Sequence, residues 1–444
     1  MALDVSAVRT NLGARPPTAQ AILFYAAFAL CVTIVTFTND VIIALIRDLT
    51  GKGADWPIRR TLQYASGDYH GQYLLASLKN AAFFACVILF GFLLRGAVAP
   101  IVPALRQRKL WTDVIIALLI ASIFLCEIVP NGMGSIYGNL SLDPFVQEQG
   151  FYHRRILMPA LAHLLHLGGV LYGLFYWAVA LGVLALSSIY LVGKGLVLSR
   201  LELASLYTIG IFATALGLPG YAEILVLGLT LLAMLDFDRH GRTGVTQPVC
   251  FALALLTHET AAVLAFGTLA LCLFDRRFLC HFTGLLALYL LIWLASYGFD
   301  LDRATTIQLA GGKSNAGQFA RTLPLVLFSL IATYKLTLLA AVPAVIGFVA
   351  ARQYRMALLI VLGLGGSVGL TAIATDYTRM MAFGSFAILI ALVAVVPRLS
   401  GRVRIALATI NLLLPTVYVS AYHGAVAYHG LYGLLLTRVF GMRG

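Results

Sequence analysis

Long apolar stretches alternate with short polar connections along most of this chain. The stretches fall near 21–38, 80–95, 112–129, 168–192, 204–218, 221–236, 248–274, 279–298, 323–350, 356–373, 378–396 and 404–421, and a weaker one covers 424–440. A helix needs roughly 20 apolar residues to cross a bilayer, and most of these stretches approach that length. They are continuously apolar, unlike the alternating strands of a membrane β-barrel. The pattern predicts an all-α transmembrane bundle of about 11 to 13 helices.

One stretch, 248–274, carries His258 and Glu259 near its middle. The short connections that are rich in lysine and arginine belong on the cytoplasmic side, together with the N-terminus. This assignment holds along the whole chain only if 248–274 returns to the side on which it starts. We therefore predict a re-entrant pair of half-helices that meet at Thr257–Thr260, instead of a single crossing that would reverse every later helix.

The polar segments are too short for a separate soluble domain. Residues 1–20 are predicted to form a cytoplasmic tail, and residues 21–444 a single membrane domain whose first helix is retained. Modest outer loops are expected near 39–79, 130–167 and 299–322. The expected location is the plasma (inner) membrane, crossed several times.

The amino-acid composition agrees with a membrane protein and argues against nucleic acid as a partner. Only 11% of the residues are charged and 61% are hydrophobic, whereas soluble domains carry about a quarter charged residues. The net charge of +13 is scattered between the apolar stretches, so it indicates membrane topology and no nucleic-acid partner. The six cysteines occur singly, without metal-ligand spacing, and no HExxH motif is present. No metal ligands are assigned, although dependence on a divalent cation stays open.

The richest candidate site is the connection that precedes residue 168. Its polar residues are Asp143, Glu148, Tyr152, His153, Arg154 and Arg155. The two arginines stand just before an apolar helix opened by Pro159, and both helix N-termini and arginine forks bind phosphate. Asp143 or Glu148 would then act as a general base beside a bound phosphate. The alternative is that the arginines contact lipid headgroups.

Other ionisable residues also stand in or beside apolar stretches. Asp68, among tyrosines of the first outer loop, is the second candidate base. Asp376 and Arg379 are three residues apart and can meet on one helical face, as an ion pair or in contact with a ligand. Lys335 lies deep in 323–350, where it could pair with Glu259 or with an anionic ligand.

Intramembrane charges such as Glu259 usually mark function, and we expect it to face a cavity together with His258. The alternative is a structural pair between this glutamate and a lysine or arginine of a neighbouring helix.

Three stretches of the sequence, taken together, resemble a known family. They are "GNLSLDPFVQEQGFYHRRILMPALAHLL", "ALALLTHETAAVLAF" and "DYTRMMAF". They are similar to segments of the GT-C superfamily of polytopic glycosyltransferases, which use polyprenyl-phosphate-linked sugars. The resemblance implies transfer of a sugar to an envelope glycan or lipid acceptor at the outer face of the membrane.

The same resemblance implies roles for particular residues. Asp143 would take the proton of the acceptor hydroxyl, and Arg154 and Arg155 would neutralise the departing phosphate, with help from Arg379 or Lys335. His258 and Glu259 would orient the acceptor or an arginine. In this family the acid usually lies in the first outer loop, so Asp68 is an alternative to Asp143.

Two other functions remain open at this point. A transporter or flippase for a lipid-linked or anionic substrate would also need buried charges. A polysaccharide polymerase would need outward-facing arginines. In each case the expected partners are membrane lipids and a lipid-linked or anionic substrate.

Overall fold

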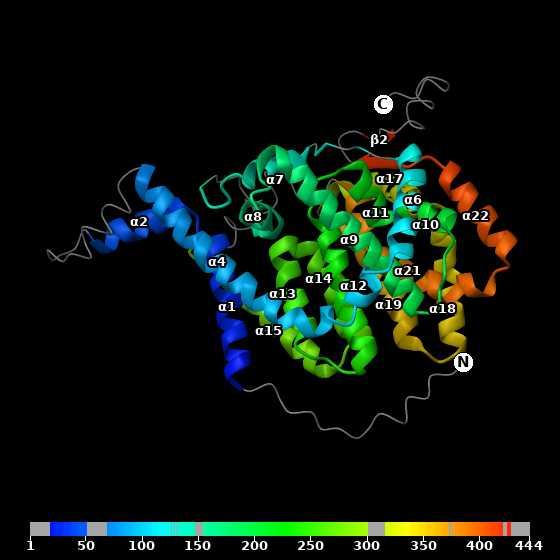
Figure 1. The fold of residues 1–444 in the computed structure, drawn as a ribbon, viewed down its shortest axis with the longest axis horizontal. Helices are drawn as coiled ribbons and strands as arrows, with labels where there is room; N and C mark the ends of the chain where they lie inside the picture. The colour runs from blue at the N-terminus through cyan, green and yellow to red at the C-terminus, as the bar shows by residue number, and fades with distance from the viewer. Residues whose placement is uncertain are drawn as a thin grey trace.

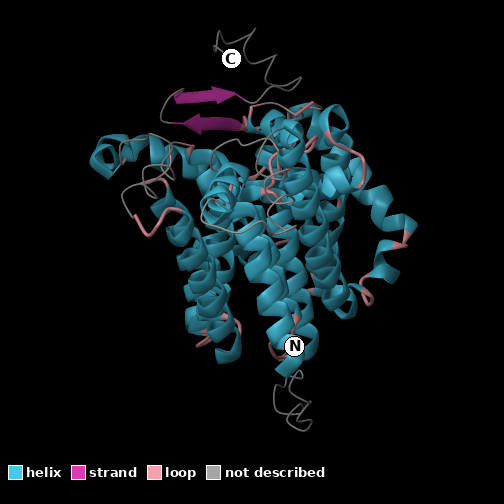
Figure 2. Cartoon of the chain, turned by 90° about the vertical axis from the view of Figure 1, so that its left-hand side faces the viewer, coloured by secondary structure: helices cyan, strands magenta, loops and turns pink. Residues whose placement is uncertain are grey.

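The computed structural model describes residues 18–50, 69–125, 127, 129–130, 132–146, 154–300, 316–372, 374, 376–420 and 424–427. Helices account for nearly all of the regular structure in these ranges, which confirms the all-α prediction. The central helices run roughly side by side, other helices lie oblique to them, and a two-stranded hairpin lies across one end of the bundle (Figure 2).

The elements of the first half of the chain are α1 (Thr18–Thr36), α2 (Asn39–Thr50), α4 (Tyr69–Val98), α5 (Val102–Leu105), α6 (Arg108–Phe124), α7 (Met133–Leu140), α8 (Leu157–Leu164), η3 (Gly169–Leu171), α9 (Tyr172–Gly193), α10 (Arg200–Tyr207) and α11 (Gly210–Gly217). Those of the second half are α12 (Glu223–His240), α13 (Thr246–Thr257), α14 (Glu259–Cys272), α15 (Arg276–Ser296), α17 (Ala316–Tyr334), η4 (Lys335–Ala340), α18 (Ala341–Ala350), α19 (Tyr354–Leu370), α20 (Tyr377–Ala382), α21 (Ser385–Val395), η5 (Val396–Arg398), α22 (Gly401–Leu413), β1 (Val417–Ser420) and β2 (Gly424–Ala427). Figure 1 shows their arrangement.

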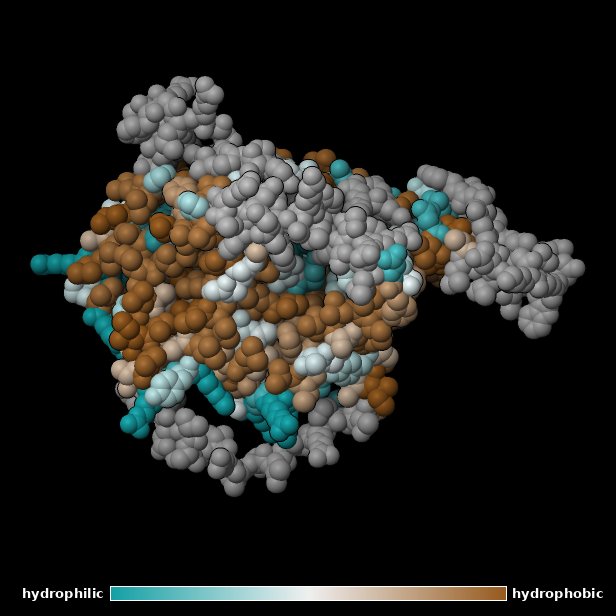
Figure 3. Space-filling model, turned by 180° about the vertical axis from the view of Figure 1, so that it is seen from behind, coloured by the Kyte–Doolittle hydropathy of each residue, from teal (hydrophilic) through white to brown (hydrophobic). Residues whose placement is uncertain are grey.

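Five helical segments within the described ranges are long and apolar enough to cross a membrane. They are Ala19–Thr36, Gln72–Val98, Gly169–Gly193, Arg276–Ser296 and Leu323–Ala350. Large apolar side chains such as Ile22, Leu119 and Val342 are exposed on the outside of the bundle, and brown apolar surface dominates the face in Figure 3. Monomeric soluble proteins rarely expose apolar area on this scale, so the chain is a multi-pass membrane protein.

The predicted half-helix pair is present. α13 has 12 residues and α14 has 14, which gives lengths of roughly 18 and 21 Å, too short to cross a bilayer alone. The helical path breaks at His258. The amide of Thr243, before α13, donates a hydrogen bond of 3.0 Å to Asp275 Oδ2, after α14. The pair therefore returns to its starting side, which we call the far end; the end at His258 is the tip end.

Three other apolar stretches are interrupted where they come together. α10 gives way to α11 at Gly210 (φ +54°), α17 gives way to η4 at Lys335 (φ +49°), and α20 gives way to α21. The Ser385 hydroxyl accepts a hydrogen bond of 2.9 Å from the amide of Ile211. The Tyr334 hydroxyl donates to the carbonyl of Met381. Irregular backbone is tolerated at membrane depth where protein groups satisfy it in this way.

Two expected outer loops contain helices, so their assignment as loops was wrong in part. Loop 39–79 holds α2 and the start of α4, and loop 130–167 holds α7 and α8. Of 299–322, residues 301–315 lie outside the described ranges, and α17 begins at Ala316.

The prediction of a helix was also wrong for the end of stretch 404–421. α22 ends at Leu413, and β1 pairs with β2 as an antiparallel hairpin, with Val417 opposite Ala427. Alternate β-branched residues in β1, Val417 and Val419, favour an extended strand, and both side chains are buried.

Candidate functional site

Glu259 is held at the tip end by Arg155. Arg155 Nη2 donates to Glu259 Oε1 at 2.9 Å, and Nε donates to Oε2 at 3.1 Å. The two side chains are only 10% and 12% exposed. A forked arginine–carboxylate pair offsets much of the desolvation cost of a buried charge. Glu259 is therefore paired with an arginine of a neighbouring segment, as in the structural alternative considered above, and it lies at the hairpin tip as predicted.

A second ionic cluster lies beside the first one. Arg379 in α20 donates to the carboxylate of Glu223 at the start of α12, and its Nη1 lies 3.2 Å from Asp376 Oδ2. Asp376 also accepts a hydrogen bond of 3.3 Å from the backbone amide of Arg379, as an N-cap residue does. The Arg379–Asp376 pair predicted from their spacing is therefore present. The Arg379 guanidinium lies 4.4 Å from the ring centre of Tyr221.

His258 connects the hairpin tip to this second cluster. Its Nδ1 accepts a hydrogen bond of 3.4 Å from the amide of Ala261 and so caps α14. The accepting nitrogen carries no proton, so in a neutral ring the proton is on Nε2. Nε2 lies 3.5 Å from Glu223 Oε1, and the ring packs edge-on against Phe383 at 5.2 Å. The hairpin tip thus contacts both α12 and the α20 segment.

Arg154 differs from its neighbour Arg155. It is 5% exposed, and its guanidinium lies 5.3 Å from the ring centre of Trp293 in α15. Among the described residues its Nη2 has no hydrogen-bond partner, and Arg154 forms no ion pair there. Tyr289 and Glu259 are close enough to interact with it. A buried guanidinium with a donor left over is suited to an anionic ligand.

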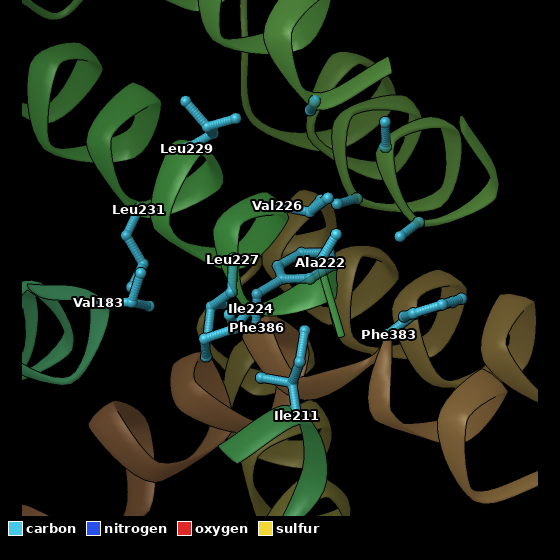
Figure 4. Close-up of a cluster of buried hydrophobic side chains, with 14 of the residues drawn as sticks. Val183, Ile211, Ala222, Ile224, Val226, Leu227, Leu229, Leu231, Phe383 and Phe386 are labelled. Carbon is cyan, nitrogen blue, oxygen red and sulfur yellow. The ribbon is translucent and has the colours of Figure 1, made fainter. Parts of the chain in front are cut away.

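An apolar core separates these charges from the far end. Val226 and Leu227 of α12 pack with Ile211, Phe383 and Phe386, and all five side chains are buried (Figure 4). The ionic clusters described above lie at the tip end of α12, whereas Asp236 and Gln247 form a buried polar pair toward its far end, with Gln247 Nε2 3.2 Å from Asp236 Oδ2.

The predicted site residues have three different outcomes. Six of them gather at the tip end: Arg154, Arg155, His258, Glu259, Asp376 and Arg379. Four lie outside the described residues: Asp68, Glu148, Tyr152 and His153. Asp143 is half-buried in the turn after α7, and no hydrogen bond or ion pair joins it to the tip-end arginines in the described ranges.

Lys335 does not pair with Glu259, which was the first of the two partners that we predicted for it. Its Nζ donates to the backbone carbonyl of Asn411 at 3.2 Å and lies 3.4 Å from the Thr208 hydroxyl. These contacts tie η4 to α22 and α10, whereas Arg155 occupies the position beside Glu259. The position of Lys335 within its apolar stretch predicts its depth in the membrane. It does not predict which neighbouring helices the side chain faces.

Glu223 is the main site residue that the sequence reasoning missed. It opens an apolar stretch, and its side chain is 2% exposed. Its Oε2 has no hydrogen-bond partner among the described residues. The sequence feature that could have identified Glu223 is the one that identified Glu259, namely an acidic residue beside a long apolar run. Tyr137 of α7 is also fully buried and lies close enough to interact with Arg155.

The described residues contain no group of three or more histidine, cysteine, aspartate or glutamate side chains that could hold a metal ion. No family model, curated protein or solved structure matches the chain.

Proposed function

We propose that this protein is a membrane glycosyltransferase of the GT-C type. It would move a sugar from a polyprenyl-phosphate donor to a glycan or lipid acceptor of the envelope, at the outer face of the plasma membrane, with its N-terminus in the cytoplasm. The proposal draws on the resemblance of three sequence stretches and on the charged residues of the tip end.

The observation that carries the proposal is the placement of Arg154. Its guanidinium is buried, leaves Nη2 without a hydrogen-bond partner among the described residues, and lies near the forked Arg155–Glu259 pair without forming an ion pair of its own there. A donor whose leaving group is a lipid phosphate needs positive charge at that phosphate. Fixed donors in a low-dielectric site are usually the largest single contribution to catalysis.

The reaction requires one proton acceptor and one leaving group. The oxygen of the acceptor hydroxyl attacks the anomeric carbon while the bond from this carbon to the phosphate oxygen breaks. The bonding electrons leave with the polyprenyl phosphate, whose charge Arg154 and Arg155 would neutralise. The hydroxyl proton passes to a carboxylate, for which Asp143 is proposed because no described residue occupies its carboxylate in an ion pair or hydrogen bond.

Glu223, Glu259 and Asp376 have a different role in this proposal. Each is engaged with an arginine, so they would hold the guanidinium groups in position. His258 would fix the hairpin tip against Glu223.

The experiment compares cell-surface and lipid-linked glycans in a strain that lacks this gene. The strain is complemented with wild type, with Asp143→Asn, or with Asp113→Asn, a matched acid-to-amide change at the far end, at equal protein levels. Loss of one sugar, restored by wild type and Asp113→Asn but not by Asp143→Asn, is the expected result. Rescue by Asp143→Asn would transfer the role of base to Asp68. An unchanged glycan profile in the deletion strain would contradict the transferase proposal.

A further inference from the structure

A groove at the far end is separate from the charged residues of the tip end. It lies between α10, η4, α18, α21 and α22 and has a volume of about 260 Å³. Its walls are almost wholly apolar, with Leu206, Leu336, Leu339, Leu392, Leu407 and Ala408 among the lining residues. Small-molecule pockets span about 300–1,000 Å³, so this groove is small and has room for part of one apolar chain.

The inner part of the groove is closed by polar groups that satisfy one another. Asn411 Oδ1 accepts a hydrogen bond of 3.1 Å from the amide of Leu336. Asn411 Nδ2 donates to Ser205 Oγ at 2.9 Å. A ligand that reaches this point does not have to supply a polar group, and an apolar chain can end there.

The rim of the groove carries positive charge. Arg404 lies on the rim and pairs with Glu202, with Nε 2.6 Å from Oε1. Arg398 is exposed, and it forms no hydrogen bond or ion pair in the described part of the chain. Its guanidinium lies against Gly347 of α18, one helical turn beyond the lining residue Pro343. Two arginines and one glutamate leave a charge of 2 − 1 = +1 at the rim.

We propose that this groove binds one phospholipid with a net negative charge, with an acyl chain between the helices and its phosphate at Arg398. The groove supplies the apolar slot, and the rim supplies charge of the opposite sign to the headgroup. Basic sites beside membrane helices select anionic lipids in this way. The site is independent of the proposed sugar transfer, because it involves none of the tip-end residues.

Two arginines of the same region provide a matched test. Arg402 is exposed, and the described residues offer it no hydrogen bond or ion pair either. The lining residues Arg404, Leu407, Ala408 and Asn411 share one face of α22, and the period of 3.6 residues puts Arg402 on the opposite face. Arg398→Gln and Arg402→Gln therefore remove the same charge close to the groove and away from it.

The purified full chain is incubated in detergent with an equal mixture of phosphatidylglycerol and phosphatidylcholine of identical chains, and retained lipid is counted by native mass spectrometry. Wild type should retain one lipid, with a preference for phosphatidylglycerol. Arg398→Gln should lower that preference about fivefold, and Arg402→Gln should leave it unchanged. Ala408→Phe, which fills the slot, should reduce retention of both lipids.

Three results would overturn the proposal. They are retention without headgroup preference in wild type, equal effects of the two arginine variants, and undiminished retention by a folded Ala408→Phe variant. Thermal unfolding of each variant establishes that it is folded. If Ala408→Phe does not fold, the comparison of the two arginine variants decides the matter.

Discussion

Opposite ends of α12 place acidic residues in different surroundings. At the tip end, Glu223 contacts Arg379, and their side chains are 2% and 3% exposed. Roughly 22 Å along the same helix, Asp238 pairs with Lys194 at 2.6 Å, and both side chains are 32% exposed. Arg200, six residues after Lys194 in the chain, pairs with Asp113 at 2.7 Å, and their side chains are 50% and 28% exposed.

Burial decides what these pairs contribute. An exposed pair gains about 0–1 kcal/mol and is screened by salt. A buried pair has a large desolvation cost, and a hydrophobic replacement of both partners is often no less stable. These two exposed far-end pairs therefore need only a modest structural benefit to persist, whereas the tip-end pairs hold desolvated charges at a position where a charged ligand could contact them.

The largest effect is expected for Glu223→Gln. The change leaves the buried Arg379 without its partner in α12, so the protein should lose about 3–5 kcal/mol of stability. Thermal or denaturant unfolding in detergent measures the loss. Asp238→Asn at the other end of α12 is the control and should cost under about 1 kcal/mol. Similar losses in the two variants would refute the distinction between the ends.

Arg155→Lys should have the next largest effect. Lysine keeps the charge but cannot form both hydrogen bonds to Glu259, and a hydrogen bond to a charged group is worth about 1.5–3 kcal/mol. Unfolding of this variant is compared with that of Arg200→Lys, where the same exchange occurs at an exposed pair. A variant as stable as wild type would mean that the fork contributes little.

A small and salt-dependent effect is expected for Asp113→Asn. The Arg200–Asp113 pair is accessible to ions, so the loss should stay below about 1 kcal/mol and disappear at high salt. Unfolding at low and high ionic strength provides the measurement. A loss that persists in high salt would show that this pair is protected from solvent.

The smallest effect concerns Asp275, which closes the far end of the hairpin. Burial alone would raise the pKa of Asp275, but hydrogen bonds from Thr243 and from the amides of Phe278 and Arg277 outweigh it and hold the pKa below its ordinary value. Its stabilising effect is thus present above the unfolded pKa of about 3.9 and is lost as pH falls through the lower folded pKa.

The wild-type advantage over Asp275→Asn should therefore shrink as pH falls from 6 to about 3. Melting temperatures of both proteins across this range test the prediction. If the advantage instead grew on acidification, the pKa of Asp275 in the folded protein would be raised and not lowered.

The sequence predicted the parts of the fold that depend on hydropathy and topology. The return of 248–274 followed from the charges of the connections, and the break at His258 lies within the expected Thr257–Thr260. Hydropathy alone did not locate α2, α7 or α8, because such short helices do not need a span of apolar residues. The strand β1 was missed because its alternating residues continue an apolar run.

The sequence could not show which of the charged residues at the site contact one another. The sequence identified Arg155, Glu259 and Arg379 as unusual charges, but contacts such as Arg155–Glu259 join residues about a hundred positions apart. Helical spacing reveals only local pairs, such as Asp376–Arg379. The choice of Arg155 over Lys335 as the partner of Glu259 depends on packing of separate helices.

The most direct test compares Arg154→Gln with Arg276→Gln, an exposed arginine at the far end, in the deletion strain at equal protein levels. Lipid extracts are analysed by mass spectrometry for polyprenyl-phosphate sugars. If Arg154 binds the donor phosphate, Arg154→Gln should accumulate unused donor and lose the corresponding surface sugar, as the deletion does, while Arg276→Gln resembles wild type. Normal donor and glycan levels in a stable Arg154→Gln protein would contradict the assignment of the tip end as the transferase site.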